Sequence, residues 1–464
     1  MLLNKTYASG SIPKDWKVAD VTAIHKKGSK FDPGNYRPVS LTSIVCKIAE
    51  SFVRDTILEY MEMNNFLSDC QHGFRHGRSC VSQLLQVMDD ISLMLDNEEP
   101  VDVVYFDFRK AFDTVPHTRL MTKLKSFGIT GTLYTWIDDF LRERTQRVRV
   151  NNIYSDYKPV LSGIPQGSVL GPLLFVVFIN DLPNGIENFI QIFADDTKLY
   201  GKAANHLSLQ NDVNLLSNWS DTWQLGFNAD KCKVMHLSNK NPKVSYSIPS
   251  KNEHVTITEV EEEKDLGVIF DTDMKFDRHI NNVVSRANRI LMIIRRTFKY
   301  LDEKTFVSLY KSMVRPILEY ANSVWHPALV RQSALIEGVQ RRATFMLRSL
   351  QSKSYTERLR SLKLPSLKYR RLRGDMIEIY KIVHGLLNIS NQSLLPFSQN
   401  VSTRGHNFKI ASQFCKTSFR KNTLACRSYS HWNSLSHATV NAKNLNCFKM
   451  CIDTELNHLQ FDYD

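Results

Sequence analysis

The sequence VDVVYFDFRKAFD, residues 101–113, contains the strand on which the interpretation of the fold depends. Its β-branched and aromatic beginning predicts a buried strand over Val101–Phe106 that ends at Asp107. Further along, FIQIFADDTKLY, residues 189–200, predicts a strand, a turn and a second strand, with Asp195-Asp196 at the tip. If the two units are neighbours in one sheet, the three carboxylates meet at one edge of it.

Three clustered carboxylates favour a divalent metal site. Such charges repel one another and lose solvation, so the cluster needs a compensating cation. Carboxylate oxygens suit Mg²⁺, and two such ions can activate a 3′-hydroxyl and stabilise a leaving pyrophosphate. The alternative is that Asp195-Asp196 is the ordinary chemistry of a hairpin turn, and the pair alone does not decide between the two.

The surrounding sequence predicts an α+β fold, because strands and helices alternate up to about residue 275 and helical periodicity dominates beyond it. The expected helices cover residues 42–63, 80–95, 118–127, 131–141, 170–180 and 207–223. The further expected strands cover residues 147–150, 233–237 and 264–270.

Composition narrows the class of protein. With 464 residues, 42% hydrophobic and 23% charged, the chain is an ordinary globular protein rather than a disordered, collagenous or coiled-coil one. The longest apolar run, Leu173–Ile179, is too short for a membrane helix, and eight cysteines without a CxxC pair predict reduced thiols, so we expect a soluble, intracellular protein without a membrane partner. The net charge of +13 favours a polyanionic partner, and the excess lies within residues 301–464.

Several motifs occur in a specific order along nearly the whole chain: GSIPKDWKVADVTAIHKKG, NYRPVSL, QHGFRHGRS, FDFRKAFD, GIPQGS, FADD, NADKCKVMHL, KDLGVIFD and HWNSLS. Together they resemble the reverse transcriptases of non-LTR (LINE-type, jockey-like) retrotransposons. The resemblance implies a right-hand polymerase with fingers (1–98), a palm with an antiparallel sheet (99–275), a helical thumb (276–350) and a basic, mainly helical C-terminal domain (351–464). Elements of this kind carry an upstream endonuclease, which we expect this chain to lack.

The resemblance also implies roles for individual residues. Asp107 would bind both metals with help from the Phe108 carbonyl, and Asp195 would be the second metal ligand with Asp196 beside it. The implied cofactor is a pair of Mg²⁺ ions, with Mn²⁺ as a substitute. Lys231 would protonate the leaving pyrophosphate, although the nearby lysine at position 233 is a rival.

Further implied roles concern the substrates. Phe112 would stack beneath the deoxyribose and reject a 2′-hydroxyl by a clash. The remaining expected contacts are Gln166 and Gly167 to the template base and nucleotide, Arg75 or Arg78 to the triphosphate, and Leu266, Gly267 and Val268 to the primer terminus. The implied partners are template RNA, primer or target DNA and deoxynucleoside triphosphates, with the nucleus as the place of function and the cytoplasm as the alternative. Oligomeric state does not follow from the sequence.

Alternatives stay open at this point. One is another palm polymerase, such as an intron maturase or a viral RNA polymerase, although Phe112 and Ala194 stand where viral enzymes typically have Asp and Gly. Another is an inactive or domesticated derivative that only binds RNA. The basic, tyrosine-containing segment Leu367–Arg373 could contact RNA or could be a solvated helical face.

Overall fold

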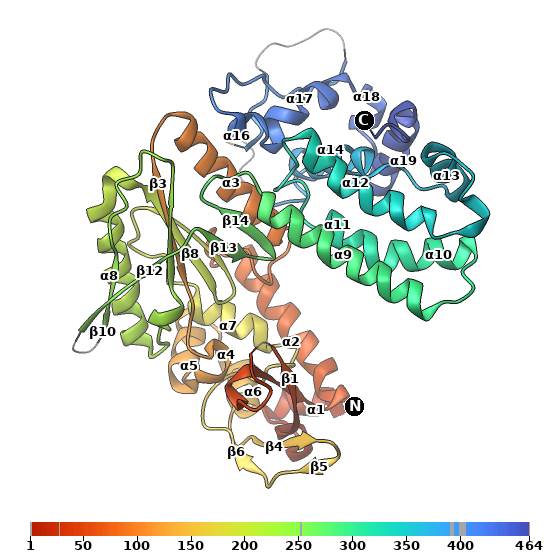
Figure 1. The fold of residues 1–464 in the computed structure, drawn as a ribbon. Coiled ribbons are helices and arrows are strands. Elements are labelled where there is room, and N and C mark those ends of the chain that lie inside the picture. Colours follow the sequence, from red (N-terminus) through yellow and green to blue (C-terminus); the bar gives the residue numbers. More distant parts are fainter. Residues whose placement is uncertain (1, 27, 251–252, 390–393, 399–404, 464) are drawn as a thin grey trace.

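The computed structural model describes residues 2–26, 28–250, 253–389, 394–398 and 405–463. It is a mixture of helices and largely antiparallel sheets, which confirms the predicted α+β class. In Figure 1 the N-terminal elements lie at the bottom, the central sheet at the left and the C-terminal helices at the upper right. Among the described residues, none of the helices combines the length and apolarity that a bilayer crossing requires.

The N-terminal part is built on a small sheet with the strand order β2-β1-β4-β5, and β6 also pairs with β4. Its strands are β1 (Val18–His25), β2 (Tyr36–Leu41), β4 (Thr145–Val150), β5 (Ile153–Tyr154) and β6 (Lys158–Pro159). The helices of this part are α1 (Leu2–Ser9), α2 (Ile44–Met63) and α6 (Gly131–Leu141). Strands from the predicted fingers and from the predicted palm therefore share one sheet. The domain boundaries themselves remain predictions.

The central sheet has the order β12-β9-β3-β8-β7, so the strand predicted at residues 101–106 lies in its middle. The strands are β3 (Val101–Phe106), β7 (Phe189–Phe193), β8 (Asp196–Lys202), β9 (Lys233–Leu237) and β12 (Thr258–Glu259). Successive side chains of a strand point to opposite faces. Val101 and Val103 accordingly enter one hydrophobic core, and Val104 and Phe106 enter the other.

Helices and two hairpins surround this sheet (Figure 1). The helices are α3 (Cys80–Asp96), α4 (Ala111–Thr114), α5 (His117–Ser126), α7 (Gly171–Ile179) and α8 (His206–Trp223). The hairpins pair β10 (Ser247–Ser250) with β11 (Glu253–Thr256), and β13 (Glu262–Asp265) with β14 (Val268–Asp271). The prediction of one continuous strand over residues 264–270 was therefore wrong. Leu266 and Gly267 both have positive φ, 43° and 90°, which turns the chain back on itself after two residues.

The last part of the chain is helical, as expected. Its helices are α9 (Asp277–Thr297), α10 (Glu303–Leu309), α11 (Arg315–Glu319), α12 (Val330–Phe345), α13 (Tyr355–Leu362), α14 (Leu367–Val383), α16 (Ser418–Lys421), α17 (Leu424–Ser434), α18 (His437–Val440) and α19 (Leu445–Glu455). These helices share a continuous hydrophobic core with α3 and with one face of the central sheet.

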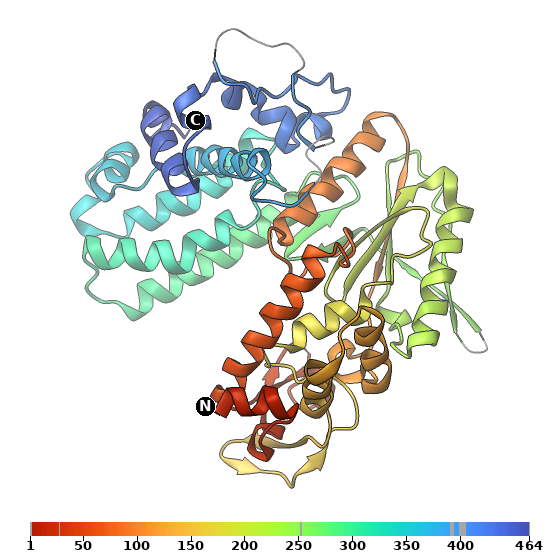
Figure 2. The same cartoon turned by 180° about the vertical axis from the view of Figure 1, so that it is seen from behind.

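The C-terminal helices are also fastened to α3 by buried polar contacts, and Figure 2 shows the two segments side by side. The Arg420 guanidinium donates to Asp89 at 2.5 Å and to the Ser92 hydroxyl at 2.8 Å, and the side chains of the ion pair are 3% exposed. Asp96, in the last turn of α3, accepts hydrogen bonds from the backbone N–H groups of Lys416 and Thr417. The described residues beyond 351 are thus integrated into the fold rather than appended to it.

Candidate active site

Strand pairing brings the three predicted carboxylates to one edge of the central sheet. Phe106, the last residue of β3, pairs with Thr197 of β8, so the next residue along each strand is Asp107 on one side and Asp196 on the other. On the other side of the hairpin, Phe193 pairs with Asp196, which leaves Ala194 and Asp195 as the two-residue turn. The condition under which the sequence predicts a carboxylate cluster, that the two units are neighbours in one sheet, is therefore met.

The carboxylates affect one another electrostatically. Partial removal from water raises the pKa of Asp195, and the charge of Asp107 adds to the rise. Desolvation also raises the pKa of Asp196 to about 6, with further contributions from Asp195 and Asp265. A bound cation would relieve this repulsion. Their oxygens are hard donors of the kind that Mg²⁺ prefers. In the part of the chain that the structure describes, however, no three His, Cys, Asp or Glu side chains are already arranged as a metal-binding group.

A buried glutamine that the sequence analysis did not single out holds the turn between β7 and β8. The Gln71 side-chain oxygen accepts hydrogen bonds from the backbone N–H groups of Gly73 at 2.7 Å and of Ala194 at 3.0 Å. Its own segment lies parallel to β7: the Ile192 N–H donates to the Cys70 carbonyl at 2.9 Å. Gln71 is 1% exposed. The segment QHGF is thus an additional strand-like support for the carboxylate turn.

Two backbone features show how closely this support fits. A Cβ atom on Gly73 would lie 2.6 Å from the Ala194 nitrogen, so only glycine allows the approach. Ala194 itself has a φ of 55°, a conformation that costs energy for any residue with a Cβ. The hydrogen bond from Ala194 to Gln71 therefore stabilises a strained turn. A glycine next to a polar residue in QHGF was the available signal in the sequence.

Lys231 reaches the carboxylates, whereas its rival does not. Its Nζ lies 3.5 Å from Asp107 Oδ2, an oxygen that accepts no hydrogen bond from the described residues. The Asn228 N–H donates to the Asp107 carbonyl at 2.7 Å, which ties the short turn carrying Lys231 to the end of β3. Lys233 instead donates to the carbonyl of Asp230.

Phe112 and the GIPQG loop lie together. Phe112, on α4, stacks on Phe175 of α7 with ring centroids 4.5 Å apart, and its carbonyl accepts from the Ile164 N–H at 2.7 Å. The Gln166 carbonyl accepts from the N–H of Ser40 in β2, so the loop is fastened to the N-terminal sheet. Gly167 has a φ of 120°, and a Cβ there would lie 2.6 Å from the Ser40 carbonyl oxygen.

A cavity of about 350 Å³ lies beside this loop, between the N-terminal sheet and α4. Its polar lining includes Ser40, Lys110, Asp113 and Gln166. Phe108 takes no part in this lining; its ring is buried and stacks on Phe227 at 4.5 Å. Of the predicted substrate residues, the structure therefore brings Phe112, Gln166 and Gly167 into one neighbourhood.

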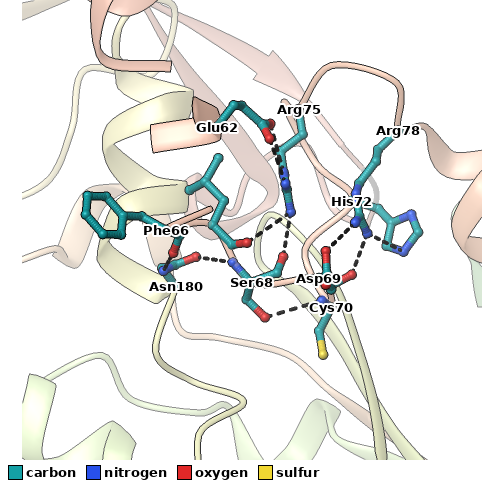
Figure 3. A network of polar contacts seen from close by, with 10 residues as sticks. Glu62, Phe66, Ser68, Asp69, Cys70, His72, Arg75, Arg78 and Asn180 are labelled. Atoms are coloured by element: carbon teal, nitrogen blue, oxygen red, sulfur yellow. Dashed lines mark hydrogen bonds and ion pairs between the residues drawn. The ribbon is translucent and has the colours of Figure 1, made fainter. Parts of the chain in front are cut away.

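Arg75 and Arg78 are engaged in a separate network (Figure 3). Arg75 donates to both oxygens of Glu62, at 3.0 and 2.8 Å, and to the Ser68 carbonyl at 2.6 Å. Arg78 donates to the side chain of Asp69 at 2.7 Å and to its carbonyl. The two arginine side chains are 5% and 4% exposed. Within the described residues, neither guanidinium contacts Asp107, Asp195 or Asp196.

Besides Lys231, positive charge from the β1–β2 hairpin acts on the carboxylates. The side chains of Arg37 and Lys26 lower the pKa of Asp195 and so oppose its rise. Both residues are exposed. They stand within the motifs HKKG and NYRPVSL, which give no indication of this role in the sequence alone. Two exposed cations beside a carboxylate cluster can bind a polyanionic ligand, which two buried, paired arginines do less readily.

The hairpin of β13 and β14 approaches the same region through buried charge. Asp265 forms an ion pair with Lys198 of β8, and both side chains are at most 5% exposed. The turn after Asp265 is fixed by Tyr320, whose hydroxyl donates to the Leu266 carbonyl at 2.8 Å. A Cβ on Gly267 would lie 3.0 Å from the Tyr320 ring. Leu266, Gly267 and Val268 therefore form a firmly held turn that is connected to the strand that begins at Asp196.

The basic segment of α14 has contacts that favour a structural role over RNA binding. Arg370 donates to both oxygens of Glu319 at 2.7 Å, and Arg373 donates to both oxygens of Asp453 at 2.5 and 2.8 Å. Arg371 is 3% exposed. The Arg370 and Arg373 guanidinium groups hold α14 against α11 and α19, so their charges are neutralised by ion pairs within the protein, and Arg371 donates to the Ser333 hydroxyl of α12.

Comparison with known proteins identifies the family. The family described as "Reverse transcriptase (RNA-dependent DNA polymerase)" matches residues 24–300, a range that contains all the predicted site residues. The chain belongs to the reverse transcriptase family. The predicted resemblance to jockey-like elements is confirmed by its relatives among the curated proteins.

Two of these reverse transcriptases come from Drosophila melanogaster. The RNA-directed DNA polymerase from mobile element jockey is 31% identical over 345 residues, which cover 70% of this chain and 37% of that protein. The probable RNA-directed DNA polymerase from transposon BS is 30% identical, over 71% of this chain and 38% of that protein. The chain therefore spans less than two fifths of the length of these relatives. Among solved structures, apo telomerase from Candida Tropicalis is similar with a TM-score of 0.44 and 11% identity, over 99% of this chain and 70% of that chain.

Proposed function

We propose that this chain is an RNA-directed DNA polymerase of a non-LTR retrotransposon, which adds deoxynucleoside triphosphates to a DNA 3′-end on an RNA template. The observation that carries the proposal is the meeting of Asp107 with Asp195 and Asp196 at one edge of the central sheet, within a chain of the reverse transcriptase family. Nothing in the comparisons favours the RNA-binding derivative or the maturase-like enzyme over this reading.

Asp107, Asp195 and Asp196 are the residues that would hold two divalent ions, Mg²⁺ or in its place Mn²⁺, with the Phe108 carbonyl as a further donor. When bound, the ions supply activation of the 3′-hydroxyl and charge neutralisation at the leaving pyrophosphate. Lys231 is the proton donor to the pyrophosphate, and its distance of 3.5 Å from Asp107 supports this role. Rate acceleration rests on positioning and on neutralised charge, so the rigidity of the turn at Ala194 matters to it.

For the substrates, we propose that Phe112 closes the space beneath the deoxyribose and that Gln166 and Gly167 hold the nucleotide and the template base. We assign binding of the triphosphate to Arg37 and Lys26 rather than to Arg75 or Arg78. The former pair is exposed and acts on Asp195, whereas the latter pair is buried and already bonded to carboxylates. The turn Leu266-Gly267-Val268 supports the primer terminus. Template RNA and target DNA are the macromolecular partners, and the nucleus is the place of function.

Primer extension by the purified chain tests the proposal. An RNA template annealed to a DNA primer should be extended in the presence of Mg²⁺ and deoxynucleoside triphosphates. Asp195→Asn should reduce extension by at least roughly 100-fold, the size of effect that follows the loss of one charge-stabilising group in an active site, and should leave RNA binding nearly intact. Asp273→Asn, at an exposed position in the turn before α9, is the matched control. Extension by Asp195→Asn within tenfold of the unchanged protein would contradict the assignment.

A further inference from the structure

A large basic groove lies at the end of α9 that is remote from the central sheet. Its volume is about 1380 Å³, and it is bounded by the last turn of α9, the connection to α10, the end of α12 and the segment before α13. A site for a drug-sized ligand occupies about 300–1,000 Å³, so this groove has room for part of a polymer. The six basic residues that line it are Arg295, Lys299, Arg341, Arg342, Arg348 and Arg358.

The negative charges of the groove do not neutralise this set. Its two acidic residues are Asp302, which caps α10 by accepting from the Thr305 N–H, and Glu303, which accepts from the Ser349 hydroxyl. Among the residues that the structure describes, no carboxylate forms an ion pair with any of the six basic side chains. The groove therefore presents uncompensated positive charge, which attracts a polyanion.

The environment of Arg358 indicates that the groove is an anion-binding site and not only a surface with many basic residues. Arg358 is 6% exposed, yet its Nε has no hydrogen-bond partner among the described atoms. Its guanidinium lies 5.2 Å from the centre of the Phe345 ring and 5.7 Å from that of Tyr355, and makes a single long hydrogen bond to the Lys353 carbonyl. A buried, incompletely satisfied guanidinium is costly, and because the Arg358 side chain lines the groove, an anion bound there would neutralise its charge.

The aromatic residues of the groove specify the kind of polyanion. Tyr300 is 92% exposed, Phe345 51% and Phe298 37%, and all three line the same hollow. Exposed rings beside arginines are the combination that binds single-stranded nucleic acid, because unpaired bases stack on the rings while phosphates contact the cations. The bases of a duplex are already stacked and paired, so a duplex would gain only the charge contacts.

We propose that this groove binds a single-stranded segment of nucleic acid, with its phosphates on Arg295, Arg348 and Arg358 and its unpaired bases against Tyr300 and Phe345. The choice of nucleic acid rests on the proposed function. The N-terminal end of α9 packs against β14, and its 21 residues extend for roughly 30 Å at 1.5 Å per residue. The segment in the groove therefore lies far from the carboxylates and is an unpaired flank of the template or of the target strand, rather than the nucleotide being copied.

Fluorescence anisotropy of the full chain tests this site without any chemistry. Labelled single-stranded RNA and single-stranded DNA of equal length form the two arms, and a blunt duplex is the comparison. A saturating unlabelled primer–template that is too short to reach the groove occupies the active site throughout, and no nucleoside triphosphate is added. Tyr300→Ala should weaken single-strand binding by about fivefold to 100-fold, the range that alanine substitution of a stacking aromatic gives. Tyr300→Phe should restore it.

The charge contacts give a second measurement. In the double variant Arg295→Gln and Arg348→Gln, the slope of log affinity against log salt concentration should fall by about 1.4, because each lost phosphate contact on a single strand contributes roughly 0.7. Arg331→Gln, on α12 outside the groove and paired with Asp277, is the control and should leave the slope unchanged. Both positions of the double variant are exposed, so the substitutions should not disturb folding.

The outcomes separate this proposal from the proposed function. Weakened binding of the RNA arm, of the DNA arm or of both supports the groove and states which strand it takes. Unchanged binding of both arms by Tyr300→Ala and by the double variant would overturn it, as would equal losses for single strands and duplex. Asp195→Asn should keep this binding while losing extension, and Tyr300→Ala should keep extension of a short pre-annealed primer–template.

Discussion

Replacing Gln71 by methionine tests whether the segment before α3 positions the carboxylate turn. Methionine has a similar length and volume but no acceptor oxygen. The backbone N–H groups of Gly73 and Ala194, which now donate to the Gln71 oxygen at 2.7 and 3.0 Å, would both lose their partner in a region that water does not reach. The substitution removes hydrogen bonds and little else.

The magnitude follows from these contacts. Each buried N–H left without an acceptor costs about 1–3 kcal/mol, so two cost about 2–6 kcal/mol. Part of this cost is offset, because the Gln71 Nε2 has no hydrogen-bond partner among the described atoms. The substitution therefore also removes an unsatisfied buried polar group. A net cost of about 2–4 kcal/mol remains. Because the Ala194 turn is strained, we expect it to relax and carry Asp195 away from its present position.

Single-nucleotide incorporation on a primed RNA template is the assay. If the full cost acts on the transition state, kcat falls by about 30-fold to 1,000-fold, since each 1.4 kcal/mol is a factor of ten. Gln71 is buried, so the KM for the nucleotide should change much less than kcat. Thermal unfolding, measured in parallel, shows whether the variant is folded at the assay temperature.

Gln83→Met is the matched control. Gln83, on α3, is fully buried, and neither its Nε2 nor its Oε1 has a hydrogen-bond partner among the described residues. The same chemical change there should leave kcat unchanged and should not lower the unfolding temperature. The reasoning would be refuted by a folded Gln71→Met protein with kcat within twofold of the unchanged chain, or by equal losses in the two variants.

Three further substitutions address the substrates. Phe112→Ala should raise the incorporation of ribonucleotides relative to deoxyribonucleotides by about tenfold or more, because the ring that would meet a 2′-hydroxyl is gone. Competition between the two nucleotides measures this ratio. Unchanged selectivity would mean that Phe112 is only a packing partner of Phe175. Arg37→Gln should raise the KM for the nucleotide by about tenfold, one lost charged hydrogen bond being worth roughly 1.5–3 kcal/mol. Arg75→Gln should instead lower the unfolding temperature and leave that KM nearly unchanged, since Arg75 is bonded to Glu62; the opposite pattern would restore the original assignment.

Much of the fold could be predicted because its decisive elements carry local signals. The strands at residues 101–106, 189–193 and 233–237 have the bounds expected from their β-branched and aromatic residues. Two strands of the N-terminal sheet, β1 and β2, were not expected. Neither is fully buried on either face, so their sequences lack the apolar alternation that identifies a strand. The β-branched pattern of residues 264–270 predicts one strand although the primer-terminus turn was expected within it, because a non-glycine residue occupies the first position with positive φ.

The candidate site likewise has features that could be predicted from the sequence and features that could not. The approach of Asp107 to Asp196 could be predicted, because both follow or begin a strand and antiparallel neighbours share an edge. The support by Gln71 could not be predicted, because the segment that carries it is distant in the sequence and pairs with β7 through a single parallel bridge. The environment of Arg75 was equally hidden. Whether an arginine is exposed or bonded to a carboxylate depends on Glu62, which the sequence presents only as one charge on a helix.

The location of the positive charge shows why composition alone misleads about the binding surface. The excess of 13 charges lies in residues 301–464, and the dense cluster in α14 is its most conspicuous part. Those arginines, however, are bonded to Glu319 and Asp453, and Arg420 is buried against Asp89, so these charges hold helices together. The field available to a ligand comes instead from arginines that are scattered in sequence over α9, α12 and α13. They gather in one groove, where among the described residues no carboxylate forms an ion pair with them. A cluster in sequence is therefore a weaker indication of a polyanion site than a cluster in space whose charges have no partner. The same criterion favours Arg37 over Arg75 at the carboxylates.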